Sequence, residues 1–110
     1  MEGFESKKSN IYVSEKLYIL EKVDRDDHIY YPNDDIIFTI ICINNSSETL
    51  ENILIRDILP KEVVPIDEVG YIVITSKGEV KQFENVIEVR VKDILPQEAI
   101  KLTIQGKVSG

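Results

Sequence analysis

The stretch Arg56-Asp57-Ile58-Leu59-Pro60 returns later in the chain as Lys92-Asp93-Ile94-Leu95-Pro96, so a basic residue precedes Asp-Ile-Leu-Pro in both places. Each copy follows a segment in which apolar residues alternate with others, at 53–55 and at 87–91. Such alternation predicts a strand, and proline ends the pairing of a strand because it has no N–H to donate. The two copies therefore predict two strand ends, which mark a fold rather than a catalytic or binding site.

Similar strands are predicted along most of the chain. The strongest, at 35–43, has apolar residues on both faces, which is typical of a central strand. Short strands with regular turns and no helical periodicity predict an all-β protein, and about seven strands in about 100 residues is the size of an immunoglobulin-like antiparallel β-sandwich. The predicted strands are 11–23 (one long or broken edge strand), 35–43, 50–58, 69–75, 80–83, 86–92 and 100–108.

Length and charge limit the classes of partner. The 110 residues predict a flexible polar leader at 1–10 followed by a single domain at 11–110. The net charge of -7 argues against binding to nucleic acid or to an anionic membrane surface, both of which need clustered Lys and Arg. No apolar segment is long enough to cross a membrane, and none follows Lys7-Lys8 as the core of a signal peptide would. Either the protein is not exported by that route, or the sequence is a piece of a longer one.

The chain offers few groups for catalysis or metal binding. Cys42 is the only cysteine and His28 the only histidine, which falls short of a zinc site and gives no sign of a nucleophile with its base. Cys42 lies in an apolar run and is predicted to be a small core residue. The sequence therefore predicts a protein that is not an enzyme and has no cofactor.

The order of motifs resembles a bacterial conserved-repeat domain, the domain of unknown function family eleven. This chain departs from the family at its turn glycines, which are replaced here by Asn33, Ser46 and Gln97. Asparagine tolerates a positive φ, whereas Gln97 predicts a different turn. The segments that carry the resemblance are Leu17 to Lys22, Asn33-Asp34, Asn44-Asn45-Ser46, Ile53 to Pro60, Ile94 to Glu98 and Leu102-Thr103-Ile104.

The resemblance implies a function as well as a fold. It implies an immunoglobulin-like module that occurs in tandem copies in large bacterial surface or envelope proteins and serves as a spacer or adhesion-type unit. It implies protein partners or neighbouring repeats of the same parent chain, and no enzymatic activity. It also implies that the two Asp-Ile-Leu-Pro copies occupy different family positions, one closing a middle strand and one preceding the last strand.

An alternative function is the binding of Ca²⁺ or another ligand by acidic loops around residues 24–35. Hard cations take several oxygen ligands from such loops. An EF-hand loop counted from Asp24 would need Gly at its sixth position and Glu at its twelfth, where Ile29 and Asp35 stand, so that motif is excluded. Solvated acidic loops are the commoner case. The candidate ligands are Asp24, Asp26, Asp27, Asp34 and Asp35.

A second possibility is an isopeptide bond of the kind found in some bacterial surface sandwiches. Lys22 is a candidate donor, and the last strand, 100–108, contains no Asn or Asp to accept it. The acceptor would have to be Asp57 or Asp93 at a strand end. The simpler prediction is that both carboxylates accept backbone N–H groups in the turns that follow them.

The remaining residues of the two copies have predicted structural roles. Pro60 and Pro96 are predicted to stop the pairing of their strands, and Leu59 and Leu95 to fill the two ends of the core.

Other polar and aromatic residues have an ordinary structural interpretation beside a functional one. Tyr30, Tyr31 and Tyr71 would suit a binding face, but aromatic residues on strands are common in sheet packing. Two overlapping glycosylation sequons begin at Asn44 and Asn45, and we interpret this segment as a turn.

Overall fold

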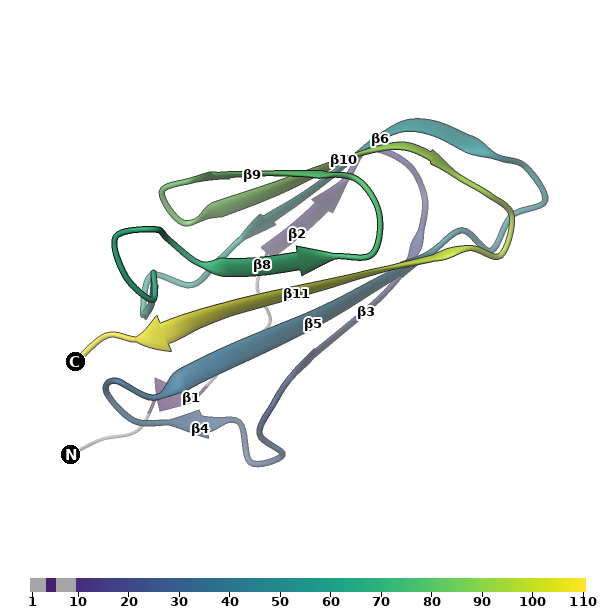
Figure 1. Ribbon diagram of the computed structural model, residues 1–110. Coiled ribbons are helices and arrows are strands. Elements are labelled where there is room, and N and C mark those ends of the chain that lie inside the picture. The colour runs from purple at the N-terminus through teal and green to yellow at the C-terminus, as the bar shows by residue number, and fades with distance from the viewer. Residues whose placement is uncertain (1–3, 6–9) are drawn as a thin grey trace.

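Two antiparallel sheets form the body of the protein in the computed structural model, which describes residues 4–5 and 10–110 (Figure 1). The predicted leader at 1–10 lies largely outside these residues. The described residues form these strands: β1 (Phe4–Glu5), β2 (Asn10–Val13), β3 (Tyr18–Val23), β4 (Ile29–Tyr30), β5 (Asp35–Ile43), β6 (Leu50–Ile58), β7 (Val63–Val64), β8 (Ile72–Thr75), β9 (Glu79–Phe83), β10 (Val86–Ile94) and β11 (Ala99–Val108).

The strand order divides the chain between the two sheets. One sheet has the order β2-β6-β10-β9 and is called here the β6–β10 sheet. The other, the β5–β11 sheet, has the order β3-β5-β11, and both β7 and β8 pair with the far side of β11. A small separate ladder joins β1 to β4. Every ladder is antiparallel, and the two sheets pack together as an all-β sandwich, as the sequence predicts.

The predicted strand at 11–23 is broken into two strands that belong to different sheets. β2 pairs with β6, and β3 pairs with β5. The crossing begins at Ser14, whose N–H donates to the Leu54 carbonyl and whose hydroxyl accepts the Leu54 N–H. Each half therefore covers one edge of one sheet. The predicted strand at 69–75 is shorter than expected, because a turn at Asp67–Gly70 precedes β8.

The core lies between the sheets and is built from branched aliphatic side chains. β5 has the alternation that the sequence predicts, with every second residue buried, and it runs between β3 and β11 as a central strand. Branched side chains suit such a surface because they pack well on a pleated sheet. The largest fully buried side chains are Tyr30, Ile36, Phe38, Ile40, Ile53, Ile55, Leu59, Ile87, Ile94, Ile100, Leu102 and Ile104.

The two copies of Asp-Ile-Leu-Pro are buried in different ways, which corrects one prediction. Leu59 fills the core at 2% exposure, but Leu95 is 52% exposed, and Ile94 is buried in its place at 0%. Along β10 the burial pattern shifts after Val91, so that Ile94 rather than its neighbours faces the core. The shift coincides with a gap in the β6–β10 ladder, where Asn52 of β6 has φ 54.

The turn after the second copy also differs from expectation. Gln97 has φ 67, and the Glu98 N–H donates to the Leu95 carbonyl at 3.0 Å. Pro followed by a residue with positive φ is the pattern of a type II turn, in which glycine is the usual second central residue. Gln97 therefore adopts a positive φ for which glycine is usual, although a glutamine at this position predicts another type of turn. Asn33 (φ 71) follows Pro32 in the same way, as expected.

Candidate functional site

The acidic residues around 24–35 are engaged in hydrogen bonds that fix their own loop. The Tyr30 hydroxyl donates to Asp24 Oδ1 at 2.6 Å, and the Ile37 N–H donates to the same oxygen at 3.1 Å. Burial and this bond to Asp24 raise the pKa of the Tyr30 phenol far above its usual range. Arg25 places its guanidinium 4.8 Å from the centre of the Tyr30 ring and forms a 2.9 Å ion pair with Asp34. The hydrogen bond from the Tyr31 N–H, followed by Arg25, lowers the pKa of Asp34.

In this loop the Asp24 carboxylate accepts the hydroxyl of the buried Tyr30, and the Arg25 guanidinium lies over the Tyr30 ring. Of the other candidate ligands, Asp27 accepts the Ile29 N–H at 3.0 Å, while Asp26 and Asp35 are exposed. Within residues 4–5 and 10–110 no three His, Cys, Asp or Glu side chains gather where they could hold a metal ion. The geometry of this loop favours a structural role for its carboxylates.

Asp57 lies inside the sandwich, near the only cysteine. Its exposure is 0%, and that of Cys42 on the opposite sheet is 1%. Burial, together with the charge of Asp57, raises the pKa of the Cys42 thiol to about 11, so the thiol stays protonated at neutral pH. Lys22 is exposed on the outer face of β3, opposite Thr39, so the structure does not bring it to Asp57 as an isopeptide bond requires.

Asp93 has a different role from the one predicted. Lys77 Nζ donates to Asp93 Oδ1 at 2.6 Å and to Glu98 Oε1 at 3.1 Å. Glu98, not Asp93, accepts the Leu95 N–H of the following turn, at 2.8 Å. That bond and the Lys77 ammonium lower the pKa of Glu98, and the two carboxylates raise the pKa of Lys77. This cluster fastens the turn at one end of the sandwich.

Asn44 is a buried polar residue that the sequence interpretation treated as part of a turn. Its exposure is 0%. Its amide nitrogen donates to the carbonyls of Glu48 at 2.8 Å, Ile94 at 2.9 Å and Leu95 at 3.2 Å, and its amide oxygen accepts the Ser46 N–H and hydroxyl. The alternation of β5 contains a signal for this, because 36, 38, 40 and 42 point inward and 44 continues their phase. Asn45, which begins the second sequon, is exposed.

The three tyrosines considered as a binding face do not share one. Tyr30 and Tyr71 are buried, at 0% and 5% exposure, and the Tyr71 hydroxyl donates to the Val63 carbonyl. Only Tyr31 is substantially exposed. The structure supports the packing interpretation.

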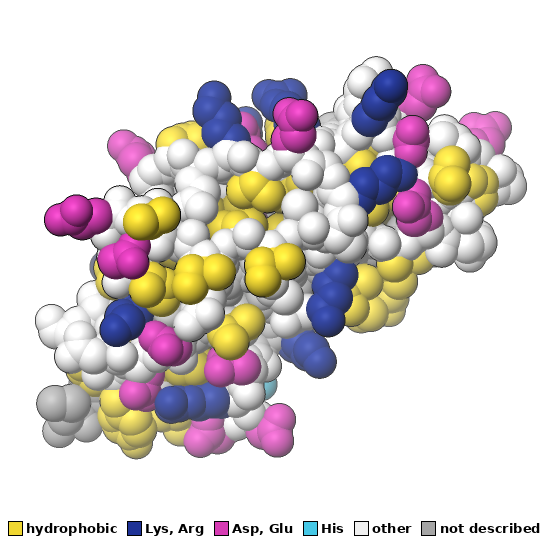
Figure 2. Space-filling view, in the orientation of Figure 1, with side chains coloured by type: hydrophobic (Ala, Val, Ile, Leu, Met, Phe, Trp, Pro, Cys, Tyr) yellow, Lys and Arg dark blue, Asp and Glu magenta, His cyan; other side chains and the backbone are white. Residues whose placement is uncertain are grey.

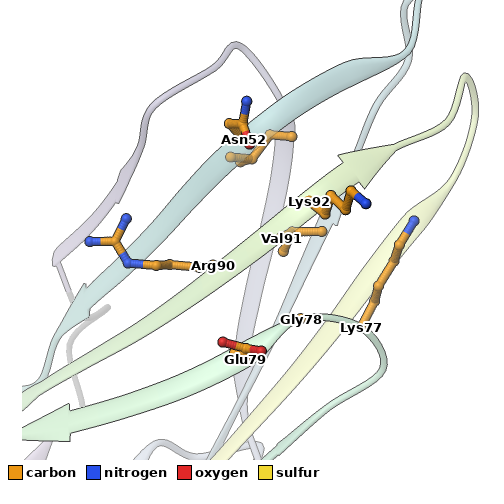
Figure 3. A pocket seen from close by; sticks show the side chains of 8 residues that line it. Asn52, Lys77, Gly78, Glu79, Arg90, Val91 and Lys92 are labelled. Carbon is orange, nitrogen blue, oxygen red and sulfur yellow. The ribbon is translucent and has the colours of Figure 1, made fainter.

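A hollow of about 380 Å³ lies at the start of β9, where Glu79 pairs with Arg90 of β10 (Figure 3). Arg90 and Lys92 stand on its β10 side, and Lys77 on the other. Its positive charge is largely offset, because Glu79 is the direct cross-strand neighbour of Arg90 and Lys77 is already bound to two carboxylates. The hollow therefore lacks the concentrated charge of an anion site.

The outer side of the β5–β11 sheet presents an apolar surface. Ile74 is 65% exposed and Tyr18 53%, although both lie within strands. Figure 2 shows apolar side chains across the middle of this side, with acidic side chains mostly around its margins. Cross-strand register places the outward residues in adjacent rows, and we call this surface the apolar-lysine face. It comprises Tyr18, Leu20 and Lys22 of β3, Ile37, Thr39, Ile41 and Ile43 of β5, Ala99, Lys101 and Thr103 of β11, and Ile72 and Ile74 of β8.

The charges on the apolar-lysine face are positive. Lys22 and Lys101 lie on either side of Ile41 and Thr39, and both are exposed. A shallow hollow of about 300 Å³ lies beside Lys22. The one acidic residue in the same phase, Asp35, stands at the end of the sheet opposite Lys107. An apolar surface that carries positive charges is chemically suited to an apolar partner that carries acidic groups.

The chain matches no protein-family model, no curated protein and no solved structure. No helix among the described residues is long and apolar enough to span a bilayer.

Proposed function

We propose that this protein is a non-enzymatic structural and adhesion-type module that binds protein partners through the apolar-lysine face. The observation that carries the proposal is the exposure of that face, where Ile72 is 48% and Leu20 45% exposed in addition to Ile74 and Tyr18. Contiguous apolar patches of this kind mark protein contact sites, whereas scattered exposed apolar residues do not. The sheet beneath holds the contacts in fixed positions, as a spacer or adhesive unit requires.

The charges on the apolar-lysine face indicate which chemical groups a partner would carry. The chain carries a net charge of -7, yet the charges of the face are the ammonium groups of Lys22 and Lys101. A partner that places carboxylates opposite these lysines and apolar side chains opposite the isoleucines would gain both hydrophobic burial and electrostatic complementarity.

The positions of the chemically reactive residues support a structural rather than a catalytic role. Cys42 is enclosed in the core with a protonated thiol. His28 has φ 60 in the exposed turn between β3 and β4, where its N–H donates to the Arg25 carbonyl. Each therefore has an ordinary role in packing or in a turn.

The proposal includes a setting, which rests on the family resemblance of the motifs. A bacterial surface or envelope protein would contain this module among further copies, and neighbouring copies are then natural partners. The complete gene tests this part: further modules of the same pattern together with an export or anchor signal are expected. A complete gene that encodes only one such module and no such signal would contradict it.

The contact surface itself can be tested by photo-crosslinking in the cells that produce the protein. A photoreactive residue at Ile74 should link to a protein segment that carries acidic and apolar residues. The control position is Val69, which is 89% exposed and apolar but lies in the loop before β8. Lys101→Glu should remove the Ile74 product. Equal yields at Ile74 and Val69, or an Ile74 product that Lys101→Glu leaves unchanged, would refute the proposal.

A further inference from the structure

The edges of the two sheets are protected unequally. An edge strand exposes unpaired N–H and C=O groups, and proteins usually block it by shortness, charge or a covering segment. β2 has four residues. The far side of β11 is covered by two short pieces, β7 and β8. β9 carries Glu79 and Lys81, and its Gln82 side chain bonds to both the N–H and the C=O of Tyr71.

β3 is longer than these strands and no described segment covers it, and its two charged residues, Glu21 and Lys22, lie in its second half. It runs for six residues without proline, and its register with β5 is continuous from Tyr18 opposite Ile43 to Val23 opposite Phe38. Within the part of the chain that the structure describes, β3 pairs with no strand other than β5. Its first three residues, Tyr18, Ile19 and Leu20, are 53%, 36% and 45% exposed. An apolar, regular and open edge of this length is suited to pairing with another strand.

We propose that β3 pairs antiparallel with β3 of a second copy of the chain, about a two-fold axis at Leu20. The inference deepens the proposed function and rests on it, since it names a second copy as one partner. In an antiparallel pair, residues directly opposite each other lie on the same side of the sheet. The two β5–β11 sheets would join into one, and their apolar-lysine faces would form a single continuous surface.

Among two-fold axes at the central residues of β3, 19–22, charge selects the one at Leu20. An axis at Glu21 would place two carboxylates opposite each other, and an axis at Lys22 two ammonium groups. An axis at Ile19 would place Lys16 opposite Lys22. An axis at Leu20 avoids all three of these like-charge pairs. It pairs Leu20 with Leu20, Ile19 with Glu21, Tyr18 with Lys22, Leu17 with Val23 and Lys16 with Asp24 of the second copy.

The favourable contacts of this register lie on both sides of the axis. Leu20, 45% exposed in the single chain, would be covered by its counterpart. Tyr18 and Lys22 are on the outer side, where an ammonium group over a phenol ring adds a cation–π contact. The contact is isologous, so each interaction occurs twice and the assembly closes as a dimer.

Disulfide trapping tests the pairing and its register. Leu20→Cys would place two thiols on directly opposite residues, about 4.5–5.5 Å apart at Cα, which a disulfide can bridge. Cys42 is buried and does not compete. The matched control is Ile74→Cys, on the same face but at the opposite edge. With diamide as oxidant, Leu20→Cys should form covalent dimers at least about tenfold faster than Ile74→Cys, because pairing raises the local thiol concentration.

The outcomes separate this inference from the proposed function. Equal rates of cross-linking, or no covalent dimer from Leu20→Cys in a sample whose fold is intact by circular dichroism, would refute pairing through β3. A specific Ile74 photo-crosslink would then still support the apolar-lysine face as a contact for another protein. Conversely, a Leu20→Cys dimer without a specific Ile74 product would keep the dimer and refute the contact face.

Discussion

Replacing Asn44 by aspartate should destabilise the protein severely without changing the size of the side chain. In the wild type, the Asn44 amide nitrogen donates to the carbonyls of Glu48, Ile94 and Leu95 at 2.8, 2.9 and 3.2 Å. A carboxylate would turn an acceptor oxygen toward these carbonyls and would bring a charge to a position that is 0% exposed. Loss of buried donors and burial of an unpaired charge together cost about 3–5 kcal/mol. That is a large share of the roughly 5–15 kcal/mol that stabilises a typical domain.

The matched control is Asn45→Asp, the same chemical change at the neighbouring exposed residue. It should stay within about 0.5 kcal/mol of the wild type, as exposed substitutions usually do. Urea unfolding of the three proteins, followed by circular dichroism, measures both differences. If Asn44→Asp lost no more stability than Asn45→Asp, the network around Asn44 would not hold this end of the sandwich.

The Asn44→Asp deficit should also depend on pH. Burial opposite carbonyl oxygens raises the pKa of the new carboxyl group above its unfolded value of about 3.9. The folded variant then binds more protons than the unfolded one, so its stability falls as pH rises from that value. The deficit against the wild type should therefore be smaller at pH 4 than at pH 7. An equal deficit at both pH values would contradict a charge-based origin.

Three further substitutions test other parts of the structure. Tyr30→Phe removes the hydroxyl that donates to Asp24 at 2.6 Å. It should lower the free energy of unfolding, measured in urea, by about 1–2 kcal/mol. The control Tyr31→Phe, at an exposed position, should leave that free energy nearly unchanged. Gln97→Gly should stabilise the protein by up to about 1 kcal/mol, because φ 67 strains a residue with a Cβ, and a lower midpoint would contradict the assigned turn. Glu98→Gln should destabilise the protein at neutral pH. Since the folded pKa of Glu98 is lowered, the difference from the wild type should disappear as pH falls through that pKa, and a difference that persisted in acid would exclude the charge of Glu98 as its cause.

The long central strands could be predicted from sequence because local alternation and tertiary burial agree there. β6 begins and ends where the pattern predicts, and so does β5, whose alternation has every second residue buried. The division of 11–23 could not be predicted in the same way, because β2 and β3 are each held by a different partner strand, β6 and β5. Edge strands take their position from the neighbour they pair with, which local periodicity does not report.

The candidate surface could be predicted only in part. The second face of β5 is apolar in the sequence, and that pattern predicts a central strand. In the structure Ile41 and the other outward residues of β5 are only half-buried, so the same isoleucines form part of the apolar-lysine face. Sequence identifies an apolar side, but the topology decides whether another layer of the same chain covers it.

The two Asp-Ile-Leu-Pro copies show that the same local motif can place its leucine either inside the core or in solvent. Each leucine carbonyl precedes a proline, where the chain leaves its ladder, and such a carbonyl needs a donor from elsewhere. The Leu59 carbonyl accepts the Asn85 side-chain amide at 2.9 Å, and the Leu95 carbonyl accepts that of Asn44 at 3.2 Å. The hydrogen bond is the same in kind, but Leu59 is buried and Leu95 exposed, because β10 changes phase opposite Asn52. The motif therefore specifies how a strand stops, while the ladder beside it specifies which side chain enters the core.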